Sequence, residues 1–176
     1  MNAIPEGDDQ GARTGRKVRL LSGTMKGMLF QETSTSGAVY VKIYVFIWKK
    51  YQTSDWGTNP YVNSPSYGLF LEEDPISGFP AYNSFRNNDF KKDYAVLKTV
   101  NLVLPADNYS GQARRKPFSF SYKIPQKYAL NEYKGISNQD LTNPAIHCIA
   151  VSNNGLTSNN TGVDIVLQNR IYDTDL

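Results

Sequence analysis

The chain has 176 residues, which fits one domain that buries a core without disulfides or metal ions. A single cysteine and a single histidine exclude a disulfide framework and the usual Cys/His metal sites, and they make a Ser–His triad hard to support. No apolar run is long enough for a transmembrane helix, and the formal net charge of +3 is too small to assign a partner.

The charges are distributed unevenly along the chain. Two basic blocks, residues 11–50 and 86–134, alternate with acidic blocks. A fold that places both basic blocks on one surface would present them to a polyanion, and a solvated face of mixed charge is an equally favoured alternative.

Residues 1–16 contain Pro and several Gly, show no periodicity, and are predicted to form a flexible N-terminal arm. In residues 17–20 (KVRL) the alternation places both cations on one face of a first strand. Gly23 is expected to end this strand, and Met25–Gln31 is expected to form a second one. The arm therefore turns basic at its inner end, where its cations are Arg13, Arg16, Lys17 and Arg19.

The stretch Ala38–Tyr51 is the element around which the chain is expected to be organised, because β-branched and aromatic residues dominate it. Read with a period of two, both of its faces are largely apolar, which predicts a central strand with cover on each side. A buried helix is the rival interpretation, and the β-branched residues together with Gly37 weaken it. One face carries Val39, Val41, Ile43, Val45 and Ile47, and the other carries Tyr40, Lys42, Tyr44, Phe46 and Trp48.

Residues 52–66 are predicted to form a long loop. Its Trp56 and Tyr61 either hold the loop against its own domain or act as anchors in a protein–protein contact, where Trp and Tyr are enriched. Three adjacent carboxylates at 72–74 favour a solvent-exposed turn over a cation site, because no further ligands follow at regular offsets.

Asn83–Asp93 is the best helix candidate, with Ser84 as its cap. It leads into a predicted strand, Tyr94–Leu104, which Pro105 ends. One face of this strand is expected to hold Tyr94, Val96, Val100, Leu102 and Leu104.

Residues 106–115 are expected to form a loop that ends in the basic run Arg114-Arg115-Lys116. Pro117–Ile124 then shows the cleanest alternation in the chain and predicts a half-buried strand with one wet face. Phe118, Phe120, Tyr122 and Ile124 form its apolar face.

Two last strands are predicted at Ile146–Ser152 and Val163–Tyr172, separated by a turn rich in Asn, Gly, Ser and Thr. His147 and Cys148 fall inside the first of them and are interpreted as a buried structural pair.

Seven or eight strands, one short helix and long connections predict an all-β protein. The pattern favours a Greek-key or jelly-roll β-sandwich that spans residues 17–176 behind the arm at 1–16. The sequence contains no phosphate-binding glycine loop, zinc-protease motif or paired cysteines, so we expect no enzyme, no cofactor and no metal. A glycosidase with two carboxylates in a cleft is a remote alternative.

Several segments, taken in order, carry a resemblance to a known family. They are Val39–Lys50 followed by Gly57-Thr58, Phe85–Tyr94 with its Arg/Lys/Asp pattern, Pro117–Ile124, Asn143–Ser152, and Val163–Tyr172 with its Arg-Ile-Tyr ending. In their order and spacing, over roughly residues 15–172, they resemble the capsid proteins of viruses with circular, Rep-encoding single-stranded DNA genomes, such as geminivirus, nanovirus and circovirus coat proteins. The acidic start MNAIPEGDDQ departs from the long Arg/Lys-rich arm of that family.

The resemblance implies a single jelly roll, an eight-stranded antiparallel β-sandwich. Its copies would close into a small icosahedral T=1 shell around a single-stranded DNA genome. The partners would be the chain itself and that DNA, with no membrane, in the virion and in the host nucleus during assembly. Basic residues would face inward and contact phosphate without sequence preference. The residues expected to do so are Arg13, Arg16, Lys17 and Arg19 first, and Arg114, Arg115 and Lys116 second.

Subunit contacts in such a shell would come mainly from the long loops, with Trp56, Tyr61 and Phe79 as anchors. A carbohydrate-binding, lectin-like β-sandwich that recognises sugar through exposed Tyr and Trp is the alternative function. The choice of DNA over RNA rests on the resemblance alone, because the same cations suit either polyanion.

Overall fold

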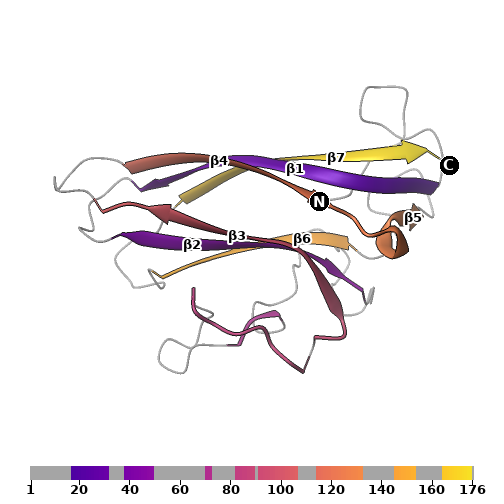
Figure 1. Cartoon of the computed structure of the whole chain (residues 1–176), viewed down its shortest axis with the longest axis horizontal. Coiled ribbons are helices and arrows are strands. Elements are labelled where there is room, and N and C mark those ends of the chain that lie inside the picture. The colour runs from indigo at the N-terminus through magenta and orange to yellow at the C-terminus, as the bar shows by residue number, and fades with distance from the viewer. Residues whose placement is uncertain are drawn as a thin grey trace, which may run out of the picture.

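The computed structural model describes residues 17–31, 38–49, 70–72, 82–89, 91–106, 114–132, 145–153 and 164–175. These residues form two antiparallel β-sheets packed face to face, so the predicted all-β sandwich is confirmed (Figure 1). The strands are β1 (Lys17–Gln31), β2 (Val39–Trp48), β3 (Tyr94–Leu104), β4 (Arg114–Lys123), β5 (Leu130–Glu132), β6 (Ala145–Ser152) and β7 (Asp164–Asp175). A single turn of 3-10 helix, η1 (Gln126–Tyr128), separates β4 from β5.

Each sheet is built on one central strand. In the first, β1 pairs with β7 along one edge and with β4 and then β5 along the other. In the second, β2 lies between β3 and β6. The connections β1–β2, β3–β4, β5–β6 and β6–β7 all pass from one sheet to the other. The described residues thus form six long strands and the three-residue β5, against an expectation of eight strands.

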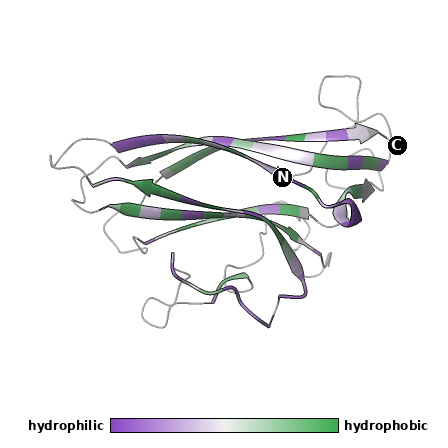
Figure 2. Cartoon of the chain, viewed as in Figure 1, coloured by the Kyte–Doolittle hydropathy of each residue, from purple (hydrophilic) through white to green (hydrophobic). Residues whose placement is uncertain are grey.

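The strand β2 is central and covered on both sides, as its two apolar faces predict. One face is buried against the β1 sheet and holds Val39, Val41, Ile43, Val45 and Ile47, each at most 1% exposed. The hydrophobic residues are concentrated on the strands of this sheet, whereas the β1 sheet is more mixed in hydropathy (Figure 2). The sheet with two covered faces is therefore the more apolar one.

The other face of β2 is buried under a third layer, formed by residues 70–72, 82–89 and 91–93 below the β2 sheet in Figure 1. Phe46 is fully buried there and stacks on Phe70, with ring centroids 4.2 Å apart. Tyr94 meets the Phe70 ring at 4.7 Å and the Trp48 ring at 6.4 Å. This aromatic cluster closes the outer side of the β2 sheet to solvent.

The strand β3 has the predicted bounds, but its apolar residues do not share one face. The pairing register with β2 shifts between Val45 and Phe46, which face Lys98 and Val96, so Leu97 is an extra residue at a β-bulge. Tyr94 and Val96 consequently pack in the outer aromatic cluster. Leu97, Val100, Leu102 and Leu104 pack between the two sheets.

The two short strands expected on either side of Gly23 are one continuous strand, β1, with an irregularity between Leu20 and Ser22. Gly23 does not end the strand, because its role is to admit a neighbouring side chain. A Cβ at this position would overlap the Tyr122 ring of β4, which lies directly over the glycine. The glycine therefore marks a close approach within the sheet rather than a turn.

The prediction of a helix at Asn83–Asp93 is wrong. Its first half is extended: Arg86 forms a bridge to Leu71, and the amide of Asn87 donates to the carbonyl of Phe70 at 2.9 Å. The side chain of Asn87 then accepts from the amide of Asp89 at 3.0 Å. Such local side-chain bonds compete with helix formation, which explains the turn.

His147 and Cys148 pack within the sandwich, in agreement with their interpretation as a structural pair. The His147 ring stacks on Phe46 at 5.6 Å. Burial lowers the pKa of His147 to about 3 and raises the pKa of the Cys148 thiol to about 11, so both are neutral at physiological pH.

The buried His147 predicts a loss of stability in mild acid. Its ordinary pKa of 6.5 in the unfolded chain exceeds the folded pKa of about 3, so the unfolded state binds the extra proton first. The free energy of unfolding should fall by about 2 kcal/mol between about pH 7.5 and pH 5, a range above most carboxyl pKa values. His147→Gln should flatten this slope in urea titrations, whatever its effect on stability at neutral pH. A slope unchanged by the substitution would contradict the assignment.

Candidate nucleic-acid interface

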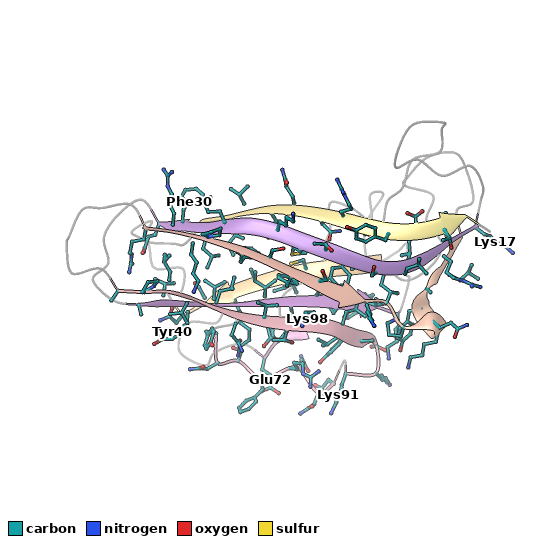
Figure 3. All side chains as sticks on the ribbon, turned by 45° about the horizontal axis from the view of Figure 1, so that its top comes forward. Lys17, Phe30, Tyr40, Glu72, Lys91 and Lys98 are labelled. Atoms are coloured by element: carbon teal, nitrogen blue, oxygen red, sulfur yellow. The ribbon has the colours of Figure 1, made fainter. Side chains whose placement is uncertain are left out.

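The outer face of the β1 sheet is the open face of the sandwich. Its side chains belong to the residues of β1, β4 and β7 that point away from the core, and they are exposed or half-buried. Figure 3 places Lys17 and Phe30 on this sheet, opposite the layer that carries Glu72 and Lys91. Among the residues that the structure describes, a third layer covers one side of the sandwich and no element covers the other.

Cations spread over this open face. On this face β1 contributes Lys26 between two uncharged polar neighbours, since Lys26 pairs with Ser119 of β4 and Gln168 of β7. Arg170 pairs with Thr24 one row further along β1. We call this surface the basic face. Its exposed cations are Lys17, Arg19, Lys26, Arg115, Lys123 and Arg170.

The acids on the strands of this sheet do not neutralise the middle of the basic face. Glu132 of β5 takes the register position opposite Lys17, and Asp173 and Asp175 of β7 take those opposite Leu20 and Val18. Asp164 takes the position opposite Phe30, so all four acids lie toward the two ends of β1. The rows through β1 residues 22–28 pair only with polar, basic or apolar residues of β4 and β7. Like charges gathered on one surface without carboxylates between them produce a positive potential that attracts polyanions.

The predicted basic residues have different positions in the structure. Lys17 and Arg19 alternate with buried Val18 and Leu20, and both are exposed on the basic face, as the sequence pattern indicates. Arg13 and Arg16 lie outside the described residues. Of the four cations in the first set, the structure therefore describes two, and both are on the basic face.

The run at 114–116 lies in β4 rather than in a loop, and two of its three cations have internal partners. Arg114 is buried and donates to Gln31 and, at 2.8 Å, to the carbonyl of Pro105. Lys116 donates from Nζ to the carbonyl of Val103 at 2.7 Å. Both side chains connect β4 to the end of β3 across the sandwich, so of this run Arg115 contributes to the basic face.

Three cations of the basic face were missed in the sequence: Lys26, Lys123 and Arg170. A signal existed for Lys123, because it shares the wet side of β4 with Ser119 and Ser121. Lys26 and Arg170 come together only through the pairing of β1 with β7, strands far apart in the sequence. No local pattern contains that register.

The expected interface anchors Trp56, Tyr61 and Phe79 lie outside the described residues. Among the described hydrophobic side chains, Phe85 in the third layer is 76% exposed, and Val166 on β7 is 58% exposed.

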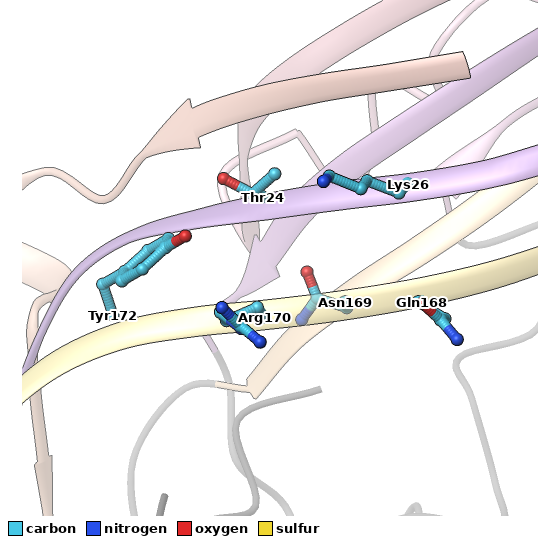
Figure 4. Close-up of a pocket in the computed structure, with 6 residues that line it drawn as sticks. All are labelled: Thr24, Lys26, Gln168, Asn169, Arg170 and Tyr172. Carbon is cyan, nitrogen blue, oxygen red and sulfur yellow. The ribbon is translucent and has the colours of Figure 1, made fainter. Parts of the chain in front are cut away.

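An open hollow of about 440 Å³ lies on the basic face between β1 and β7. Figure 4 shows its six lining residues, Thr24, Lys26, Gln168, Asn169, Arg170 and Tyr172. The ring of Tyr172 is 45% exposed, and Asn169 accepts at Oδ1 from the Tyr122 hydroxyl at 3.1 Å. The lining thus combines two cations, an accessible aromatic ring and amide groups.

The described residues contain no cluster of three or more His, Cys, Asp or Glu side chains that could hold a metal ion. In that same part of the chain, no helix is long and apolar enough to cross a membrane. No family model matches the sequence, and no curated protein matches it either.

Proposed function

We propose that this chain is a structural capsid protein that assembles into a small icosahedral shell and encloses a single-stranded DNA genome. The observation that carries the proposal is the basic face, an uncovered sheet surface with no carboxylate in its middle rows. Contact with phosphate there needs no sequence preference, as packaging of a whole genome requires. The protein would act in the virion and, during assembly, in the host nucleus.

The winding of the chain supports a jelly roll as the finer description of the sandwich. The first long strand β1 pairs with the last, β7, and the second, β2, pairs with β6, one pair in each sheet. The chain crosses repeatedly from one sheet to the other. Double-sheet jelly rolls are a fold of viral capsid domains, so this winding suits a subunit of a shell wall.

The two sides of the sandwich fit the two sides of a shell. In this proposal the basic face lines the lumen, and the third layer over the β2 sheet, with exposed Phe85, faces outward or toward a neighbouring subunit. Arg13 and Arg16 precede Lys17 in the sequence and would add to the lumenal charge.

Particle sizing tests this function directly. Purified full-length chain should form uniform closed particles in light scattering and electron micrographs, at some combination of salt and pH. Particles from cells should contain nucleic acid that DNase, rather than RNase, removes after disassembly. Lone molecules under all these conditions would contradict the proposal, and lone molecules with measurable glycan affinity would favour the lectin-like alternative.

A further inference from the structure

We propose that the hollow between β1 and β7 binds a single nucleotide of the packaged strand, with Tyr172 stacking on the base and Lys26 and Arg170 holding the phosphate. This inference rests on the proposed function and gives the basic face a defined subsite. The rest of the face would attract phosphate as a diffuse surface, whereas the hollow would also contact the base.

The register of β1 and β7 sets the relative positions of these three side chains. Tyr172 and Arg170 are two residues apart on the same face of β7, which corresponds to about 7 Å along a strand. Lys26 is on the neighbouring strand, opposite Gln168, so it approaches the hollow from the side facing Arg170 (Figure 4). The ring of Tyr172 is in one row, and the two cations are in the next two rows along the strands. This arrangement matches the base and the phosphate of one nucleotide.

The exposure of Tyr172 favours a ligand over a packing role for its ring. The side chain is 45% exposed on a sheet face where small hydroxyl residues surround it, because its row partner is Ser22 and the next row holds Thr24. Aromatic rings presented on a β-sheet are a common platform for single-stranded nucleic acid, since any base can stack on them.

Two of the remaining lining residues suit the edge of a base or a sugar. The amide of Gln168 and the hydroxyl of Thr24 supply both donors and acceptors on the basic face. Asn169 lies opposite the buried Met25, and its Oδ1 accepts from the buried Tyr122 hydroxyl, so its amide is held at the core side of the sheet. No carboxylate is among the six lining residues, so the hollow favours an anionic ligand over a cation.

The test compares two probes on the unassembled full-length chain, a short oligothymidylate and an abasic oligomer of the same length and charge. Fluorescence anisotropy should give tighter binding of the oligothymidylate. Tyr172→Ser should weaken that binding by about tenfold and leave the abasic oligomer unaffected, because one stacked base is lost. Tyr172→Phe should retain wild-type binding, since the ring remains.

Two controls separate the subsite from general effects. Tyr40→Ser removes a ring of similar exposure, 41%, from the other sheet and should change neither affinity. Lys26→Gln should weaken both probes equally, because it removes a phosphate contact. Equal binding of the two probes by the wild-type chain, or tighter binding of a neutral oligosaccharide, would overturn the inference.

Particle sizing on the same preparations distinguishes this failure from failure of the proposed function. Closed particles together with equal binding of both probes would refute the subsite alone. Base-dependent binding without particles would support the subsite and refute the shell.

Discussion

Phe46→Ala is expected to lower the free energy of unfolding by about 3–5 kcal/mol, the range for a buried phenylalanine whose site cannot collapse. The Phe46 side chain is fully buried in the middle of β2, the central strand of its sheet. Its ring stacks on Phe70 at 4.2 Å and meets Tyr94 edge-on at 6.3 Å. The substitution removes both aromatic contacts and leaves a cavity between the β2 sheet and the third layer.

Urea unfolding of the unassembled chain measures this loss through the midpoint of the transition. Phe85→Ala is the matched control, since it deletes the same side chain from a position in the third layer that is 76% exposed. Its effect should stay within about 0.5 kcal/mol, as for surface positions in general. Similar losses for the two variants would show that the third layer does not pack on β2 as described.

The same strand explains why much of the fold could be predicted. A run of β-branched and aromatic residues with two apolar faces has few stable environments, and β2 occupies the central, doubly covered one. The alternation in β4 is equally direct, since Tyr122 and Ile124 are buried and Ser119 and Ser121 are exposed. In both strands the period of the apolar side chains alone predicts which faces are buried.

The errors share a different cause, because each depends on a contact with a distant residue. The sequence around Gly23 predicts a strand end, and only the contact with the Tyr122 ring explains why the glycine lies inside a strand. The extra residue Leu97 shifts the face of β3 by one position, and no local pattern marks the bulge. At Arg86 the helical spacing of charges gives way to a bridge with Leu71, a residue outside the segment that shows this spacing.

The basic face is a long-range feature of the same kind. The sequence reveals two charged blocks, and the alternation at residues 17–20 identifies two of the cations. It does not separate Arg114, which is buried against Gln31, from its neighbour Arg115, which is exposed. The alternation of β4 makes that distinction, but the run was expected in a loop, where no alternation applies.

Removing the three cations of the middle rows should give the largest effect on nucleic-acid binding. In the triple variant Lys26→Gln, Lys123→Gln, Arg170→Gln, three phosphate contacts are lost from the part of the basic face that lacks carboxylates. Each contact with a single strand contributes about 0.7 to the slope of log affinity against log salt, so the slope should become shallower by about 2. The affinity for an abasic oligomer at about 0.1 M salt should fall about hundredfold.

A charge-matched control places the same three neutralisations on the opposite side of the sandwich. Arg86, Lys91 and Lys92 are exposed on the third layer, and their replacement by Gln lowers the net charge equally. This control should retain at least most of the affinity, since an exposed charge more than a Debye length of about 10 Å from the bound strand is largely screened. If both triple variants lose affinity to the same extent, net charge rather than the basic face attracts the polyanion. Shells of the first variant should still close but contain less nucleic acid, because none of its three substitutions touches the packed core.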